Sequence, residues 1–341
     1  TNTGAAISTG IQNTLVGGLA GDALTDADYN TTLGYSALTA DTLGNRSTAI
    51  GYATLAAQNF TTATDTYNTA VGYQAGTAIT TGQFNTLVGG LAGDALTTGN
   101  TNTAVGYIAL SADILGDRNV AIGFQSLGAQ NFTTSTDSYN TAVGYDSGAS
   151  VTTGISNTFV GGLTGDGTDD GNYNTAVGQK ALSGNCGNSN TVMGYQAAVA
   201  ATGAGNTCIG TEAGLALTSG DSNVLIGQNA GRTGSPGGNL TSGSDNIVLG
   251  NGSTGTFNCQ VSLTVASDQR DKTDFTALDV GLDFVKALNP VTYKWDKRSK
   301  YGDKSTEDYD LNAQTPDGTH KEDWLDVGFK AQEIAAGYKI A

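Results

Sequence analysis

A serine and a lysine lie five residues apart in the segment ASDQRDKTD, residues 266–274. Ser267 could act as a nucleophile if a base removed its hydroxyl proton, and Lys272 could be that base if burial lowered its pKa. The carboxylate of Asp271, beside Lys272, would favour the charged ammonium and oppose this role. These residues by themselves leave two interpretations open: a Ser-Lys dyad, or an inert serine near a solvated lysine.

The other residue types that commonly carry chemistry are scarce or poorly spaced. His320 is the only histidine, which argues against a Ser-His-Asp triad and a histidine-based zinc site. Cys186, Cys208 and Cys259 have no CxxC spacing, so we expect inert buried thiols. The segment GDGTDDGN, residues 165–172, lacks the spacing and terminal Glu of a calcium loop, which favours an acidic turn. We expect no metal, no cofactor and no activity on other molecules.

Most of the chain before residues 266–274 is repetitive. The residues NTLVGGLAGDAL at 13–24 return unchanged at 85–96, and looser copies lie between and after them. The copies align on a glycine at a nearly constant step, and a larger block also repeats, so that Gly17 corresponds to Gly89. A short fixed period is typical of a solenoid, in which each coil covers the apolar face of the next. The aligned glycines are Gly17, Gly34, Gly51, Gly72, Gly89, Gly106, Gly123, Gly144, Gly161, Gly178, Gly194, Gly210, Gly227 and Gly250.

The residue types at aligned positions predict where the chain turns and what it buries. An asparagine stands four residues before the glycine in every copy except one, where Ser47 replaces it. Asn suits a corner at which a strand begins, and stacked copies could form an amide ladder. A large aliphatic residue precedes the glycine, and the residue before that is mostly Ala or another apolar type. Both faces of a short strand are therefore apolar.

Two apolar strand faces pose a burial problem, because the interior of one coil can cover only one of them. We expect the Ala-rich column to pack against the same column of other chains around an axis, which predicts a homotrimer. The alternative is a monomeric solenoid whose second face is covered by loops. An aromatic residue often follows the glycine, as at Tyr35, Tyr52 and Tyr73. These rings would form a stripe, either packed between coils or available to stack on sugar rings.

The charge balance argues against two classes of partner. The formal net charge is −16, and residues 1–260 contain 4 Lys or Arg against 16 Asp or Glu, a balance of −12. An acidic surface repels phosphate backbones, so we expect no nucleic-acid partner. No apolar run approaches the ~20 residues that span a bilayer, so we expect no membrane insertion.

The sequence changes character near residue 253, where glycine becomes rare and both tryptophans follow. Residues 276–290 predict an amphipathic helix, and residues 291–296 alternate like a strand. Residues 297–323 predict a polar loop, and residues 326–334 a strand that turns into a helix.

These patterns predict a mainly β fold. We expect a trimeric parallel β-roll or β-solenoid of about 14 short repeats at residues 1–252 and a linker at 253–266. A small α+β module follows at 267–341, and we expect it to be incomplete in this sequence.

Two parts of the chain resemble known families. The NTAVGY and NTCIG segments within residues 11–252 resemble the repeats of trimeric autotransporter adhesin heads, which are left-handed parallel β-rolls. Similar arrays occur in bacteriophage tail fibres. The motifs SDQRDK, ALNPVTYKW and VGFKAQEI, in this order within residues 261–341, resemble the intramolecular chaperone autoprocessing domain of phage tailspikes, tail fibres and neck appendages.

The second resemblance implies a module that helps three chains to trimerise and to align a fibre. It also implies self-cleavage of the Ala266–Ser267 peptide bond, with Ser267 as nucleophile and Lys272 as base. Asp268 and Arg270 match further positions of the motif, with at most an orienting role.

Together these features predict a virion protein, the distal part of a bacteriophage tail fibre. Its partners would be two copies of itself, other virion tail proteins, and a host cell-surface glycan or protein. The loops that interrupt the period, 58–67, 130–139 and 232–244, would make the host contact. The alternatives are a bacterial surface adhesin or injection-system fibre and, less favoured, a polysaccharide-degrading tailspike.

Overall fold

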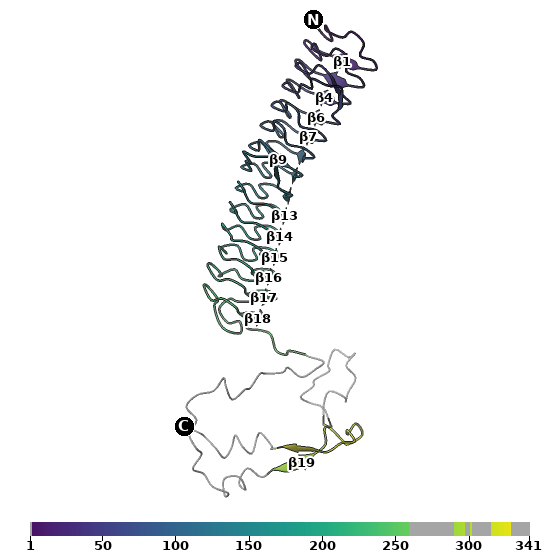
Figure 1. Cartoon of the computed structure of the whole chain (residues 1–341). Helices are drawn as coiled ribbons and strands as arrows, with labels where there is room; N and C mark the ends of the chain where they lie inside the picture. The colour runs from purple at the N-terminus through teal and green to yellow at the C-terminus, as the bar shows by residue number, and fades with distance from the viewer. Residues whose placement is uncertain (1, 259–289, 297–300, 302–314, 329–341) are drawn as a thin grey trace. The chain divides into compact units, whose positions relative to one another are not determined.

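The computed structural model describes residues 2–258, 290–296, 301 and 315–328. The chain forms two compact units, Thr1–Asn258 and Cys259–Ala341. In the first unit, fourteen strands stack into one parallel sheet along a β-solenoid (Figure 1). This architecture confirms the predicted fold, and the described residues include no helix.

Each strand of this sheet ends immediately before one of the aligned glycines. The pairing keeps aligned residues opposite each other, as in Thr86↔Thr103, Leu87↔Ala104 and Val88↔Val105. The strands, in sheet order, are β1 (Thr14–Val16), β2 (Thr31–Leu33), β4 (Thr48–Ile50), β6 (Thr69–Val71), β7 (Thr86–Val88), β8 (Thr103–Val105), β10 (Val120–Ile122), β12 (Thr141–Val143), β13 (Thr158–Val160), β14 (Thr175–Val177), β15 (Thr191–Met193), β16 (Thr207–Ile209), β17 (Val224–Ile226) and β18 (Ile247–Leu249).

The glycine that follows each strand is required by the close stacking of the coils. Gly34 has a φ of +147°, and a Cβ added to it would lie 2.1 Å from the carbonyl oxygen of Gly51 in the next coil. A side chain would therefore separate the two coils. The strands stay three residues long because this left-handed glycine ends each of them.

The asparagines form the amide ladder that their spacing predicts. The Oδ1 atom of Asn85 accepts a hydrogen bond from the backbone N–H of Asn102 at 2.9 Å, and its Nδ2 donates to the Gly99 carbonyl at 2.9 Å. Asn102 repeats both bonds to Asn119 and Gly116. Because most of these side chains are buried, the ladder satisfies backbone groups at the corners that water cannot reach.

The Ala-rich column lies inside the coil, which corrects the prediction that it faces other chains. Ala49, Ala70, Ala104 and Ala121 are fully buried within the core of a single chain. The large aliphatic residue at the end of each strand points outward instead, and Val16 and Leu33 are 53% and 49% exposed.

Three of these four alanines accompany a large residue on the opposite wall of the same coil, and Ala70, with Gly76, is the exception. Where the middle strand residue is Ala, as in Ala104, the fourth residue after the aligned glycine is often a buried leucine, such as Leu110. Where the strand residue is large, as in Leu87, that fourth residue is Gly93. A Cβ on Gly93 would lie 2.9 Å from Leu87 Cδ2, so the two positions share one volume.

Two coils carry insertions that form short second sheets. Residues 58–67 include β5 (Thr64–Asp65), which pairs in parallel with β3 (Gly44–Asn45). Residues 130–139 include β11 (Thr136–Asp137), which pairs in the same way with β9 (Gly116–Asp117). These insertions therefore extend the solenoid wall.

The second unit contains a two-stranded antiparallel sheet. β19 (Val291–Tyr293) pairs with β20 (Asp326–Gly328), with Thr292 opposite Val327. The strands predicted at 291–296 and at the start of 326–334 are thereby confirmed. The predicted helix falls outside the described residues, apart from its last residue, Pro290, which is not helical. Residues 329–334 also fall outside them.

Candidate functional site

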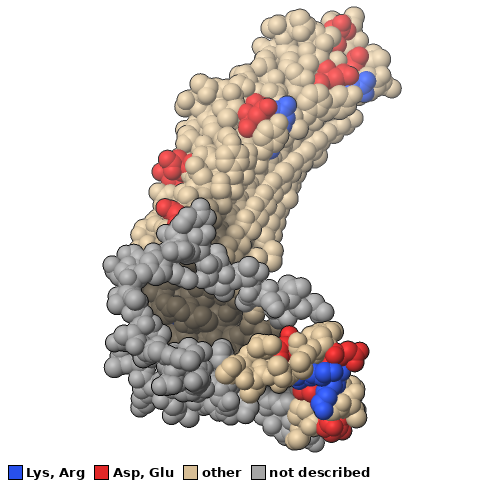
Figure 2. Space-filling view, turned by 60° about the horizontal axis from the view of Figure 1, so that its bottom comes forward, with Lys and Arg blue, Asp and Glu red and all other residues tan. Residues whose placement is uncertain are grey.

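One face of the solenoid presents two uncharged rows along its length. The first residue of each sheet strand is Thr in eleven strands and Val or Ile in three, and the third is Val, Ile, Leu or Met. The third residues are partly or largely exposed, as in Met193 (51%) and Ile226 (40%). Neither row contains a charged residue. Figure 2 shows the charged side chains of the visible face as isolated groups, separated by long uncharged stretches.

An aromatic ladder runs beside these rows. Tyr35, Tyr52 and Tyr73 stack at ring-centroid distances of 5.8 and 5.4 Å, with interplanar angles of 11° and 9°. The rings are about half exposed, but each stacked face is covered by the neighbouring ring. These aromatic rings therefore pack between coils, as one of the two interpretations predicts. The ladder is interrupted at Gly90 and resumes at Tyr107.

The first insertion covers a buried carboxylate. Asp41 is fully buried, and its Oδ1 atom accepts hydrogen bonds from the backbone N–H groups of Gly44 (3.0 Å) and Phe60 (3.1 Å). Its Oδ2 atom accepts from Gln58 Nε2 at 2.6 Å, and Gln58 Oε1 accepts from Asn68 Nδ2 at 2.9 Å. Burial raises the pKa of Asp41, although these hydrogen bonds act in the opposite direction.

The second insertion repeats this arrangement. Asp113 is fully buried and accepts hydrogen bonds from Gly116 N, Phe132 N and Gln130 Nε2 at 3.1, 3.0 and 2.6 Å. Burial again raises the pKa of the carboxyl. Each carboxyl group thus holds an insertion against the coil before it through hydrogen bonds, which is a structural role. Neither has a cationic partner among the described residues.

Each of these insertions also carries an exposed ion pair beside an aromatic ring. The Arg46 guanidinium lies 4.6 Å from the ring of Tyr29 and forms an ion pair with Asp65, with Nε 3.1 Å from Oδ2. Arg118 lies 5.5 Å from the ring of Tyr139 and pairs with Asp137.

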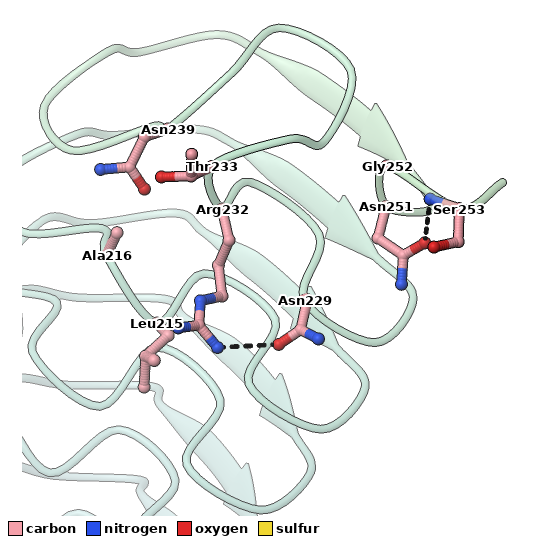
Figure 3. Close-up of a pocket in the computed structure, with 9 residues that line it drawn as sticks. All are labelled: Leu215, Ala216, Asn229, Arg232, Thr233, Asn239, Asn251, Gly252 and Ser253. Atoms are coloured by element: carbon pink, nitrogen blue, oxygen red, sulfur yellow. Dashed lines mark hydrogen bonds between the residues drawn. The ribbon is translucent and has the colours of Figure 1, made fainter.

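The third insertion, residues 232–244, helps to form a pocket of about 540 Å³ near the end of the solenoid (Figure 3). Nη1 of Arg232 donates hydrogen bonds to Glu212 Oε2 and to Asn229 Oδ1, the latter at 2.9 Å. Asn251 is held by Nδ2 donation to the Gln228 carbonyl at 3.0 Å. The residues that line the pocket are Leu215, Ala216, Asn229, Arg232, Thr233, Asn239, Asn251, Gly252 and Ser253.

The pocket is a feature that pattern analysis of the sequence missed. Glu212 follows Gly210, and Arg232 follows Gly227 at the start of the lengthened step to Gly250. The two residues therefore lie in successive coils, and their side chains form an ion pair. A signal was present, because Arg232 is the only Lys or Arg between residues 181 and 258 and lies inside that step.

The structure leaves the Ser267–Lys272 pair a prediction from the sequence. Ser267 and Lys272 lie outside the described residues, as do Ala266, Asp268, Arg270 and Cys259. Cys186 and Cys208 are buried free thiols, and burial raises the pKa of Cys208 to about 12. His320 is exposed, and its ring meets Tyr301 edge-on at 4.8 Å.

The described part of the chain offers neither a metal centre nor a membrane-spanning helix. It contains no cluster of three or more His, Cys, Asp or Glu that could hold a metal ion. Within the same residues, no helix has the length and apolar character needed to cross a bilayer.

Comparison with known proteins identifies the C-terminal segment. Residues 267–338 match the family model described as chaperone of endosialidase. No curated protein matches the chain. The match covers about a fifth of the 341 residues and begins at Ser267. Together with the β-solenoid before it, the match supports a protein similar to tail fibres and tailspikes, with a chaperone segment at its C-terminal end.

Proposed function

We propose that this protein is part of a bacteriophage tail fibre, that three copies assemble side by side through their solenoids, and that the assembly attaches the virion to a host surface. The observation that carries the proposal is the uncharged strand face, whose aliphatic row is exposed along the solenoid. Contiguous exposed apolar surface of this length is unusual in a monomer and is typical of an interaction site.

A second and third copy of the same chain are the partners that fit this face best. Residues 1–260 carry a net charge of −12, so copies repel one another unless they meet through an uncharged surface. Fourteen rungs at about 4.8 Å make a face roughly 65 Å long, and a strand of three residues is roughly 10 Å wide. With the flanking tyrosines, each copy can bury about the 800 Å² that a stable interface needs.

The C-terminal segment would start this assembly. In the proposal, residues 267–341 bring three chains together so that their solenoids align in register. Because the coils are nearly identical, two chains shifted by one coil would still pair their apolar rows. In the proposal, residues 267–341 prevent this shift by holding the chains in register. Lys272 then takes the Ser267 hydroxyl proton and the Ser267 oxygen attacks the Ala266 carbonyl carbon. The C–N bond between Ala266 and Ser267 breaks, the freed amine of Ser267 takes up the proton, and water hydrolyses the resulting Ala266 ester to a carboxylate.

Host attachment would use the insertions rather than the strand face. Residues 58–67, 130–139 and 232–244 interrupt the period, and the third of them contributes to the pocket. Three equivalent weak sites in one assembly would act together and strengthen attachment.

Sedimentation velocity of the full chain and of a Val88→Asp variant tests the assembly. We expect a trimeric particle for the wild type, with three times the 34.4 kDa chain mass before self-cleavage and less once the C-terminal fragments have left. The variant places a carboxylate on the uncharged face, and we expect dissociation to monomers. A Thr98→Asp variant, at an exposed turn position away from the strands, is the control. A folded wild-type monomer at micromolar concentration would refute the assembly.

Intact-mass measurement of the wild type and a Ser267→Ala variant tests self-cleavage. We expect a fragment ending at Ala266 only in the wild type. Identical uncut masses for both proteins would refute the cleavage step and leave the assembly to be judged by sedimentation.

A further inference from the structure

The Arg232 side chain is held by one edge and open at the other. Its Nη1 atom donates to Glu212 and Asn229, which fixes the plane of the guanidinium. The Nε–H and Nη2–H groups have no hydrogen-bond partner among the described residues. Figure 3 shows this second edge turned toward the side of the pocket lined by Leu215 and Ala216.

The open edge has the geometry that recognises a carboxylate. Nε and Nη2 of an arginine form a planar fork that pairs with both oxygens of one carboxylate group. Because Glu212 and Asn229 already hold the guanidinium, little further side-chain entropy is lost when a ligand binds. An occupant with a carboxylate would complete the hydrogen bonding of this arginine.

The remaining walls of the pocket suit a ligand that also carries hydroxyl groups. Thr233 and Ser253 offer hydroxyls, and Asn239 offers an amide. These groups both donate and accept hydrogen bonds, as sugar hydroxyls do. Leu215 and Ala216 supply an apolar wall against which the C–H face of a sugar ring can lie. The volume of about 540 Å³ is within the range of small-ligand pockets.

Charge narrows the choice of ligand further. Glu212 neutralises Arg232, residues 181–258 contain no further Lys or Arg, and residues 1–260 carry a net charge of −12. A phosphate dianion would therefore be repelled more strongly than a single carboxylate. A neutral sugar would leave the arginine fork unpaired when it displaced water.

We propose that this pocket binds a carboxylate-bearing sugar of the uronic-acid class, with the carboxylate on the Nε–Nη2 edge of Arg232 and the hydroxyls on Thr233 and Asn239. The inference rests on the proposed attachment function and specifies the glycan chemistry that one of its insertions would recognise. It assigns Glu212 and Asn229 the task of orienting Arg232.

The test is a titration of the full chain with matched sugars, in which binding is measured by ligand-observed NMR. The acidic probes are methyl glucuronide and methyl galacturonide, and the controls are the methyl glycosides with an uncharged C6 hydroxymethyl group. We expect the acidic sugars to bind about ten- to a hundredfold more tightly, as the loss of a charge-assisted hydrogen-bonded pair implies.

Three variants separate recognition from general charge effects. Arg232→Gln should weaken binding of the acidic sugars by about ten- to a hundredfold. Arg118→Gln removes the same charge from an exposed arginine that also pairs with a carboxylate, and should leave binding unchanged. Glu212→Gln keeps an acceptor for Nη1 while removing a like charge, and should tighten binding of the acidic sugars only.

The proposal is overturned if the acidic sugars bind no better than their neutral partners, or if Arg232→Gln and Arg118→Gln behave alike. Should Arg232→Gln fail to fold, the gain expected from Glu212→Gln decides the matter, and its absence overturns the proposal. Binding of the wild type to host cells is measured in parallel. Cell binding without discrimination between the sugars refutes this inference alone, whereas sugar binding without cell binding refutes the attachment function alone.

Discussion

The packing inside one coil makes a prediction that can be tested by exchanging two residues. Ala104 and Leu110 are fully buried in the coil of β8, where a small strand residue accompanies a large residue on the opposite wall. The preceding coil has the reverse arrangement, with Leu87 on the strand and Gly93 opposite. The double variant Ala104→Leu/Leu110→Gly should therefore convert one natural packing arrangement into the other.

Each single change should destabilise the solenoid. Leu110→Gly leaves a cavity, and the free energy of unfolding should fall by about 2–5 kcal/mol, as for other large-to-small substitutions in cores. The φ of Leu110 is +53°, so the glycine offsets part of this loss, by about 1–2 kcal/mol. Ala104→Leu overfills the same space and should cost about 1–3 kcal/mol.

The double variant should be more stable than the sum of the single effects by about 2–3 kcal/mol, because the new leucine fills the cavity left by the old one. Urea unfolding at one fixed protein concentration, followed by circular dichroism, measures all four proteins in a double-mutant cycle. Additive losses, with no coupling between the two positions, would refute the reasoning that Ala104 is small because Leu110 lies opposite it.

Three further predictions concern the ladder, the buried carboxylates and the thiols. Asn102→Ala should lower the free energy of unfolding by about 1–3 kcal/mol, because it leaves Asn119 N–H and the Gly116 carbonyl without their partners; the exposed Thr98→Ala should have little effect in the same urea assay. Asp41 and Asp113 have raised pKa values in the folded chain, so the folded state binds their protons more tightly than the unfolded state. Their contribution to stability should be fully present below the ordinary Asp pKa and fall as pH rises through the raised values, and Asp41→Asn/Asp113→Asn should flatten this part of a pH–stability profile measured by thermal unfolding. Cys208, with a pKa of about 12 and no exposure, should resist alkylation by iodoacetamide at pH 8 in the folded protein and react in 6 M guanidinium; equal rates in both states would contradict its burial.

The repeat made much of the fold predictable. The aligned glycines predicted where each strand of the fourteen-stranded sheet ends, and the asparagines predicted the corner ladder, because both depend on backbone requirements that recur in each coil. Asn85 and Asn102 bond as their spacing predicts, and Gly34 lies where a side chain would meet the next coil. The strand at Val291–Tyr293 was predicted from alternation in residues 291–296, and the strand at Asp326–Gly328 from the start of residues 326–334.

The orientation of the strands could not be predicted in the same way. Alternation places neighbouring residues on opposite faces, but when both faces are apolar it does not decide which of them points inward. The tertiary structure decides this, because the opposite wall of the coil matches the middle strand residue in size, with Leu110 beside Ala104 and Gly93 beside Leu87. The middle residue therefore lies inside, whether small or large, and the third residue of the strand lies on the outer face.

For the candidate site, too, the sequence determined one part and the tertiary structure another. The sequence by itself determined that residues 58–67, 130–139 and 232–244 interrupt the period, since an insertion is visible as a lengthened step between glycines. Only the tertiary structure decided that the third insertion brings Arg232 against Glu212, because the stacking of successive coils turns their separation along the chain into a contact. The repeat pattern in the sequence thus predicts the periodic backbone geometry, whereas contacts between unlike side chains depend on how the coils stack in the folded chain.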